Sequence, residues 1–223
     1  TFNEVSMTYQ NGGEPSLENI SFTARQGQTI GIIGGTGSGK SSLVHLIPRF
    51  YDVTKGSVII NGDDVRGLAP EELRQKIGIV MQKAVLFHGT IRENMLWGKP
   101  DASDKEIREA LVTAQAMDFI EQKDGELDFV IQQGGRNLSG GQKQRLTIAR
   151  ALVRKPEILI LDDSASALDL ATDAKLRKAL QQLKYKPTVF IVSQRTSSIQ
   201  HADQILVLDD GELTGMGTHE ELL

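Results

Sequence analysis

A glycine-rich loop between a short apolar run and a helical stretch constrains the fold of this chain most strongly. The loop, GGTGSGKS at Gly34–Ser41, follows the apolar run Thr29–Ile33 and precedes Ser42–Ile47, whose spacing is helical up to Pro48. Glycines lack the Cβ atoms that would keep backbone N–H groups from pointing at one anion, and the following helix adds the positive end of its dipole. Strand, loop and helix in this order predict a phosphate-binding P-loop.

Two further features complete the predicted nucleotide site. In a P-loop, Lys40 can reach the β- and γ-phosphates of ATP, and the Ser41 hydroxyl can ligate Mg²⁺. The apolar run Ile158–Leu161 ends in Asp162, which we expect to bind Mg²⁺ directly or through water. A strand-end aspartate alone is more often a turn residue, but a P-loop in the same chain favours the metal role. The loop residues expected to contact the nucleotide are Gly34, Gly35, Thr36, Gly37, Ser38, Gly39, Lys40, Ser41 and Ser42.

Short, uniformly apolar runs separated by helical stretches predict a mostly parallel sheet that is covered on both faces. The alternating run at 19–24 and the hairpin pattern at 57–63 add an antiparallel β arm. From about 90 to 154 the pattern is helical and charged, which predicts an inserted helical subdomain. The expected fold class is α/β, as one domain over 1–223, with a core at about 1–83 and 156–223 and the helical subdomain at about 84–155.

The composition limits the classes of partner. The chain has 223 residues, 39% of them hydrophobic, and a net charge of −4, so it can form one substantial core but offers no basic stripe for nucleic acid. The absence of cysteine excludes disulfides and thiolate metal sites. No apolar run approaches the roughly 18–20 residues that cross a bilayer, and no signal pattern opens the chain. We expect a soluble intracellular domain that is a piece of something longer.

A second glycine-containing sequence, LSGGQ at 138–142, predicts a second phosphate-binding surface. It offers a hydroxyl and backbone N–H groups at the start of a helix that we expect from Lys143 to about Arg154. One ATP needs only one glycine cradle, so two such surfaces indicate a site shared between two copies or two related chains. The residues expected to contact this second nucleotide are Leu138, Ser139, Gly140, Gly141 and Gln142.

The P-loop, the LSGGQ sequence and the strand ending at Asp162 together resemble the nucleotide-binding domain of ATP-binding-cassette (ABC) transporters, over essentially the whole chain. The resemblance implies a RecA-like P-loop ATPase that uses ATP and Mg²⁺, with LSGGQ clamping the ATP held by the opposite subunit. It assigns Tyr9 to adenine stacking and Gln82 to Mg²⁺ contact and to sensing of the membrane domain. It assigns Ser166–Asp169, including Asp169, to the loop that crosses the dimer interface. Tyr9 taken alone could also be an ordinary core tyrosine.

The segment Val85–Asn94 resembles exporters rather than importers. In such exporters this domain follows six membrane-spanning helices in the same polypeptide, so we expect an excised domain at the cytoplasmic face of the cell membrane. The resemblance implies the coupling helices of the transmembrane domain as a partner.

Two positions depart from the family pattern at the chemical centre. Asp163 stands where the family has the general-base glutamate, and Gln194 stands where it has a histidine that contacts the γ-phosphate. Aspartate is shorter by one methylene, about 1.5 Å of reach, and a positioned base contributes typically 10²–10⁴-fold to rate. Such pairs of departures beside an intact LSGGQ resemble the degenerate-site subunit of bacterial heterodimeric multidrug exporters. We therefore predict that Asp163, Gln194 and Lys40 form a slow site, and that LSGGQ completes the hydrolytic site of a partner half-transporter.

Three alternatives stay open. One is a slow but active homodimeric exporter, a second is a soluble ABC ATPase that transports nothing, and a third is an importer. A smaller departure at Gln133 and Gly134, where exporters commonly carry Glu followed by Arg, removes charges that contact the membrane domains.

Overall fold

The computed structural model describes residues 1–10, 12–164 and 166–223. These form two compact units, one of Thr1–Ile77 with Thr188–Leu223 and one of Gly78–Pro187. The first unit therefore joins the two ends of the sequence, whereas the second is continuous. Within the described residues, no helix is long and apolar enough to span a bilayer. The division at 84 and 155 inferred from the sequence stays a prediction.

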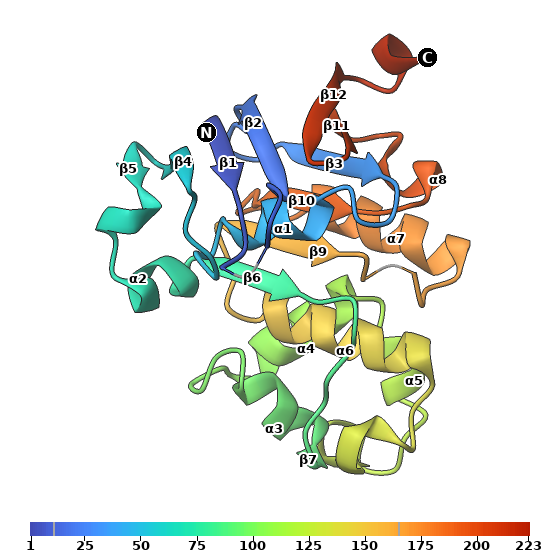
Figure 1. Ribbon diagram of the computed structural model, residues 1–223. Coiled ribbons are helices and arrows are strands. Elements are labelled where there is room, and N and C mark those ends of the chain that lie inside the picture. The colour runs from blue at the N-terminus through green and yellow to red at the C-terminus, as the bar shows by residue number, and fades with distance from the viewer. Residues whose placement is uncertain (11, 165) are drawn as a thin grey trace. The chain divides into compact units, whose positions relative to one another are not determined.

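The first unit contains the strands around the P-loop (Figure 1). Its central strand β3 (Thr29–Gly34) lies between β10 (Thr188–Val192) and β11 (Gln204–Asp209), and both neighbours run parallel to it. Strand β12 (Glu212–Gly217) pairs antiparallel with β11 at the edge. Because these central strands are buried on both faces, they consist of nearly continuous apolar residues. The parallel α/β sheet predicted from the sequence is confirmed.

A second, antiparallel sheet confirms the predicted β arm. Its strands lie in the order β2 (Leu17–Phe22), β1 (Phe2–Met7), β4 (Lys55–Ile60) and β5 (Asp63–Asp64). The β2 and β1 strands bury one face, with Val5 and Ile20 fully buried as neighbours in the register.

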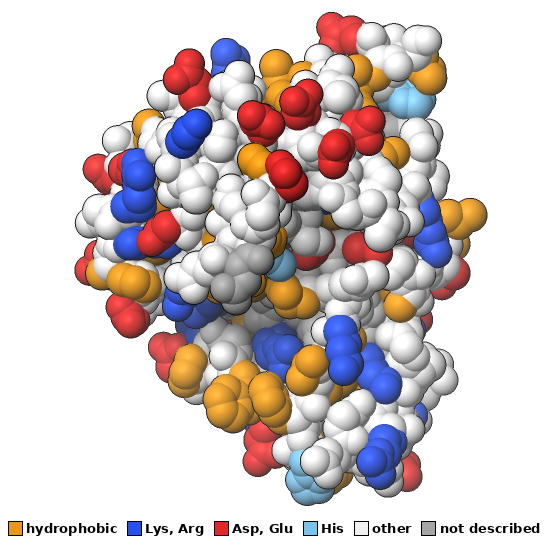
Figure 2. All heavy atoms as spheres, viewed as in Figure 1, with side chains coloured by type: hydrophobic (Ala, Val, Ile, Leu, Met, Phe, Trp, Pro, Cys, Tyr) orange, Lys and Arg blue, Asp and Glu red, His pale blue; other side chains and the backbone are white. Residues whose placement is uncertain are grey.

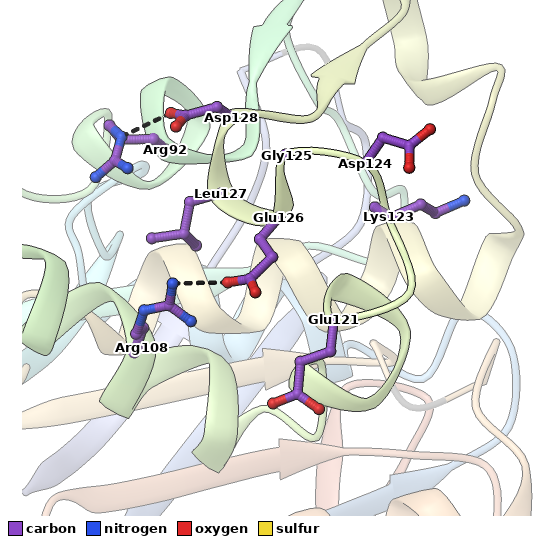
Figure 3. A pocket seen from close by; sticks show the side chains of 9 residues that line it. All are labelled: Arg92, Arg108, Glu121, Lys123, Asp124, Gly125, Glu126, Leu127 and Asp128. Atoms are coloured by element: carbon purple, nitrogen blue, oxygen red, sulfur yellow. Dashed lines mark hydrogen bonds and ion pairs between the residues drawn. The ribbon is translucent and has the colours of Figure 1, made fainter.

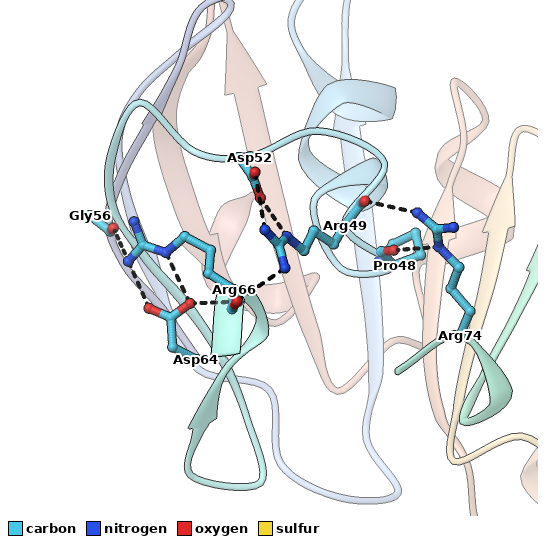
Figure 4. A network of polar contacts seen from close by, with 7 residues as sticks. All are labelled: Pro48, Arg49, Asp52, Gly56, Asp64, Arg66 and Arg74. Carbon is cyan, nitrogen blue, oxygen red and sulfur yellow. Dashed lines mark hydrogen bonds and ion pairs between the residues drawn. The ribbon is translucent and has the colours of Figure 1, made fainter. Parts of the chain in front are cut away.

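Arginine side chains fix the chain between the P-loop helix α1 (Lys40–His45) and this arm (Figure 4). Arg49 forms an ion pair with Asp52 at 2.7 Å and donates to the carbonyl oxygen of Arg66 at 3.1 Å. Arg66, on the short helix η1 (Val65–Gly67), in turn pairs with the N-cap residue Asp64 at 2.7 Å. Arg74, from α2 (Pro70–Gln75), donates to the carbonyl oxygen of Arg49 at 3.2 Å. Exposed pairs contribute little stability each, so this network mainly sets the path of the segment.

The second unit has the strand β9 (Ile158–Asp162), its neighbour β6 (Ile77–Val80) except for the first residue, and most of the described helices. The helices are α3 (Ile91–Leu96), α4 (Asp104–Thr113), α5 (Met117–Ile120), α6 (Gly140–Leu152) and α7 (Leu170–Gln181). Helices α3 and α4 pack on α6, which is buried along most of its length. A two-residue pair, β7 (Gly89–Thr90) and β8 (Val130–Ile131), was too short for the periodicity to predict.

Three helices of this unit begin with a capping box, in which the N-cap hydroxyl and the side chain three residues later each bind the other's backbone N–H. The boxes are Thr90 with Glu93, Ser103 with Glu106 and Ser139 with Gln142. The last one starts α6 at Gly140 and not at Lys143 as predicted. The reason is that the SGGQ sequence is itself an S-x-x-Q capping box, so the two glycines form the first turn of the helix.

Candidate functional site

The P-loop has the backbone that its glycines predict. Gly39, the N-cap of α1, has φ of 95° and Gly37 has φ of 82°, a region that favours glycine. A Cβ atom on Gly34 would lie 2.2 Å from the carbonyl oxygen of Leu208, so that glycine is required by packing. By contrast, a Cβ atom on Gly35 or Gly37 would meet nothing within 4 Å. The loop is therefore packed at Gly34 and open at its middle, where phosphates are predicted to bind.

The ammonium group of Lys40 lies inside this loop. It is only 8% exposed and donates to the carbonyl oxygens of Gly34 at 2.8 Å and of Gly35 at 2.6 Å. The hydroxyl of Ser38, 4% exposed, lies 3.4 Å from the same nitrogen. Hydrogen bonds to charged acceptors are stronger than those to neutral carbonyls. A phosphate oxygen that entered the loop would therefore accept a stronger hydrogen bond from the Lys40 ammonium than the two carbonyl oxygens accept now.

Tyr9 lies next to the P-loop helix. Its hydroxyl forms a hydrogen bond with the Ser42 hydroxyl at 2.8 Å, and its ring meets Tyr51 edge to face, with centroids 5.0 Å apart. Tyr9 is half-buried and Tyr51 is 44% exposed. The first unit thus brings Tyr9 to the predicted phosphate site with an aromatic surface in reach of solvent, as adenine stacking requires; the stacking role itself stays a prediction.

Gln194 follows β10, which lies beside the strand that leads into the P-loop. The pairing continues past the strand, because the backbone N–H of Ser193 donates to the carbonyl oxygen of Ile32 at 3.1 Å. Gln194 itself is exposed. It therefore lies at the carboxyl end of the sheet, the same edge as the loop, where ligands of open α/β sheets bind.

The second unit brings Gln82, Asp162 and Asp163 together. Gln82 comes two residues after β6 and donates from its amide nitrogen to an Oδ atom of Asp163 at 3.1 Å. Asp162 is the last residue of β9 and is 4% exposed. Asp163 has φ of 47°, and its carbonyl oxygen accepts from the Ser166 hydroxyl at 2.8 Å. The expected ligands of Mg²⁺, the Ser41 hydroxyl, the Gln82 amide and the Asp162 carboxylate, offer the oxygen donors that this ion prefers.

The LSGGQ residues form the start of α6. Ser139 is exposed and accepts from the backbone N–H of Gln142 at 3.2 Å, while the Gln142 side chain accepts from the Ser139 N–H at 3.0 Å. A Cβ atom on Gly140 would meet nothing within 4 Å, whereas one on Gly141 would lie 3.2 Å from the carbonyl oxygen of Ala167. Gly141 thus allows the helix start to lie close to the loop before α7. Helix α6 packs through an apolar stripe, since Leu146 and Ala149 are fully buried.

Asp169, predicted to lie in the loop across a dimer interface, is the N-cap of α7. Its carboxylate accepts from the backbone N–H of Thr172 at 2.9 Å and from the Thr172 hydroxyl at 2.7 Å. These bonds, the backbone one first, lower the pKa of Asp169. The sequence analysis missed this capping role, although an aspartate directly before a helical run is a capping pattern.

The exporter-like segment Val85–Asn94 is held by one buried side chain. Asn94 is 1% exposed and bonds the backbone N–H and carbonyl oxygen of Phe87, each at 3.0 Å. Phe87 and Trp97 lie with ring centroids 5.0 Å apart and are 45% and 69% exposed. In Figure 2 large apolar side chains lie beside basic ones in the lower part of the view, which holds α3 and α6 in Figure 1. We call Val85, Phe87 and Trp97 the apolar patch.

The comparison with known families matches the description "ABC transporter" to residues 17–166. The chain belongs to the ABC transporter family. The match includes the P-loop, the LSGGQ sequence and Asp162, which are the features of this family that the sequence displays most clearly.

Several ABC proteins resemble the chain over its full length. The "Beta-(1-->2)glucan export ATP-binding/permease protein NdvA" of Rhodopseudomonas palustris (strain BisB5) is 48% identical over 100% of this chain and 37% of that protein. An uncharacterized ABC transporter ATP-binding protein of Bacillus subtilis, YfiB, is 50% identical over 100% of the chain and 38% of that protein. The chain thus spans less than two-fifths of the curated relatives it matches.

A solved structure gives the same result for the fold. The "Structure of a bacterial Atm1-family ABC exporter with ATP bound" matches with a TM-score of 0.95 and 37% identity, over 100% of this chain and 39% of that one. The ABC-type P-loop NTPase fold is therefore confirmed, and the chain is similar to the ATP-binding part of ABC exporters.

Proposed function

We propose that this chain is the ATP-binding and ATP-hydrolysing domain of an ABC exporter, and that its own P-loop forms a slow, degenerate site. Its LSGGQ sequence would complete the hydrolytic site of a partner half-transporter in a heterodimer. The domain would lie at the cytoplasmic face of the cell membrane. In support, the P-loop and α6 retain the backbone and donors that phosphate binding needs, whereas Asp163 and Gln194 depart from the family pattern.

The observation that carries the slow site is the identity of these two residues. Hydrolysis needs a base that takes a proton from water while the water oxygen bonds to the γ-phosphorus and the bond to the bridging oxygen breaks. Asp163 has a carboxylate for this task, but with about 1.5 Å less reach than glutamate. That carboxylate also accepts a hydrogen bond from Gln82, so one of its oxygen atoms already has a donor. Gln194 can donate a hydrogen bond but cannot carry a positive charge. Mg²⁺ would neutralise phosphate charge when bound.

The apolar patch fits a second proposed partner, the coupling helices of a transmembrane domain. Exposed apolar side chains that cluster together mark interaction sites more often than scattered ones do. Arg150 contacts two residues of the patch, since it donates to the carbonyl oxygen of Val85 at 2.8 Å and its guanidinium lies 5.6 Å from the centre of the Phe87 ring. Replacing Trp97 with serine is expected to uncouple transport from ATP hydrolysis while the ATPase of the isolated domain stays unchanged.

The cargo is proposed to be of the multidrug type, because the two departures resemble that group of exporters. The glucan exported by the NdvA relative is the competing cargo class. Efflux of an amphipathic dye from vesicles that contain the full transporter would support the first, whereas stimulation of the ATPase by a soluble glucan would support the second.

Steady-state ATP turnover tests the degenerate site. We expect the unmodified chain to hydrolyse ATP slowly alone, the Asp163→Glu, Gln194→His double variant to be roughly 10²-fold faster or more, and a Lys40→Ala version of that variant to lose the gain. Binding of a fluorescent ATP analogue serves as the control, because it should be similar in the first two proteins. Fast turnover by the unmodified chain alone would reject the slow site.

An active homodimeric exporter is the second candidate, favoured by a P-loop and an LSGGQ sequence that are both intact in one chain. Slow turnover by this chain without any partner, at a rate that rises with the square of the chain concentration, would support it. A second cassette in the parent gene would support a soluble ABC ATPase, and membrane helices on a separate polypeptide would support an importer. The parent gene decides between these last two.

A further inference from the structure

An open groove of about 900 Å³ lies within the second unit. Neither the LSGGQ residues nor Asp163 are among the described residues that line it. Three segments line it: helix α4, the residues 152–155 that end and follow α6, and the residues 182–185 that follow α7. Leu152 and Val153 are buried at 3% and 2% exposure, whereas Val112 is 58% exposed. The groove thus has an apolar floor and an apolar side chain at its opening. Its volume is within the range of small-molecule sites.

The charges around the groove favour an anion. Four basic residues line it, Lys105, Arg108, Lys155 and Lys184, against the two acidic residues Glu106 and Glu109. The local charge is therefore +2, on a chain whose net charge is −4. Both acidic groups already have basic partners: Glu106 bonds Lys99 at 2.5 Å, and Glu109 lies 3.8 Å from Lys155.

Two lysines of the groove are not neutralised by the protein. Within the described residues, Lys105 and Lys184 form no ion pair, whereas Arg108 pairs with Glu126 at 2.7 Å. Exposed lysines are ordinary on a protein surface. Next to an apolar floor, however, they add a charge preference to a site that would otherwise accept any apolar ligand.

A neighbouring pocket of the same unit shows what a self-neutralised site looks like (Figure 3). It has about 480 Å³ and polar walls, and Arg92 and Arg108 there point at Asp128 and Glu126. Its three basic residues are matched by four acidic ones. That pocket has little apolar surface and no excess of positive charge. The groove is therefore the better site for a ligand that is both apolar and negatively charged.

Tyr185 adds a polar group without a partner. Its hydroxyl is buried and, among the described residues, has no hydrogen-bond partner. Burial raises the pKa of Tyr185 to about 12, so at neutral pH the group is a proton donor. A buried donor without an acceptor costs stability, and an anionic group that entered the groove would provide the acceptor once the side chain turned toward it.

We propose that this groove binds a small amphipathic anion, whose apolar body lies on Leu152 and Val153 and whose acidic head lies at the lysines of the rim. This site is separate from the proposed ATP chemistry, so its failure would leave that proposal untouched. The ligand is a free molecule in solution, and not a lipid in a bilayer surface.

The test uses dodecanoate, below its micelle concentration, as the probe and isothermal titration calorimetry of the 223-residue chain as the readout. We expect saturable binding, at least tenfold tighter than that of dodecyltrimethylammonium, which has the same chain length and the opposite charge. Lys105→Ser with Lys184→Ser should weaken dodecanoate binding by roughly tenfold, since exposed charge contacts contribute about threefold each.

Two single substitutions make the test independent of folding. Val112→Asp should abolish dodecanoate binding, whereas Val130→Asp, at a valine that is 51% exposed and does not line the groove, should leave it unchanged.

Tyr185→Phe tests the hydroxyl of the groove. It removes a hydroxyl that has no partner among the described residues, so it should keep or raise stability and weaken dodecanoate binding severalfold. Equal affinity for the two amphiphiles, or equal affinity of the Val112→Asp variant and the unmodified chain, would overturn the proposal. So would Val112-dependent binding to phosphatidylglycerol vesicles without binding of monomeric dodecanoate.

Discussion

The serine of LSGGQ has two separable tasks, because Ser139 caps α6 and is also predicted to contact a phosphate. Ser139→Ala removes the oxygen that accepts from the Gln142 N–H at 3.2 Å, while the reciprocal bond from the Ser139 N–H to the Gln142 side chain can remain. Ser139→Asp keeps an acceptor at the same position and adds a negative charge. The two variants therefore separate the structural task from the phosphate-binding one.

The magnitudes follow from the position of the residue. Loss of an N-cap side chain costs about 1 kcal/mol, and Ser139 is exposed, so no buried group is left without a partner. We expect Ser139→Ala to lower the free energy of unfolding by about 1 kcal/mol, which is about 2–4 °C in Tm for a chain of this size. Ser139→Asp should be neutral or more stable by up to about 0.5 kcal/mol, because aspartate caps equally well and its charge favours a helix N-terminus.

Binding of ATP between two chains should respond in the opposite order. Two like charges about 4 Å apart repel by about 4 kcal/mol at an effective dielectric constant of about 20, or roughly 10³-fold in affinity. Ser139→Asp should therefore lose ATP-dependent dimerisation, whereas Ser139→Ala should only weaken it. Urea unfolding measures the first effect, and light scattering with a non-hydrolysable ATP analogue measures the second. A Ser139→Ala variant as stable as the unmodified chain, or a Ser139→Asp variant that dimerises normally, would refute this reasoning.

Two other predictions concern stability in the second unit. Asn94→Ala should lower the free energy of unfolding by about 3 kcal/mol, since it removes three hydrogen bonds, to the Phe87 N–H and to the carbonyl oxygens of Phe87 and Thr90, at about 1 kcal/mol each; a loss under 1 kcal/mol in urea unfolding would contradict it. Glu106 has its pKa lowered to about 2 by the bonds from Lys99 and then Ser103, so its stabilisation is complete above about pH 4.5 and is lost as the pH falls toward 2. Glu106→Gln should flatten unfolding stability in that window, and an unchanged pH profile would count against the pair.

The sequence predicted those parts of the fold that local patterns determine. The P-loop, the buried strands around it and the β hairpin at 57–63 each depend on residues that are close together in the chain. The helical pattern from about 90 to 154 was predicted from local spacing, and α4 at Asp104–Thr113 lies within it. The start of α6 was misplaced because the glycines at 140 and 141 suggested a loop, although the capping pattern around them was readable from the sequence.

Contacts between distant segments could not be predicted in this way. Gln82 and Asp163 are 81 positions apart, and Tyr9 and Ser42 are 33 apart, so only the fold brings each pair into hydrogen-bonding distance. The family resemblance named three of these residues singly but did not state that they touch each other. The groove is a stronger case, since its three segments carry no motif and become one site only when α4, α6 and the end of α7 pack together.

The backbone at Asp163 adds a cost that a comparison of side-chain lengths leaves out. At φ of 47° the residue is in the left-handed region, where a Cβ atom costs about 1–2 kcal/mol and where aspartate is tolerated better than most side chains. Asp163→Glu should therefore gain reach for catalysis but lower the free energy of unfolding by about 0.5 kcal/mol. Turnover and urea unfolding of the same preparation measure both effects. A variant that is faster with no loss of stability would show that reach alone separates the two carboxylates, whereas one that is less stable and no faster would place the defect at Gln194.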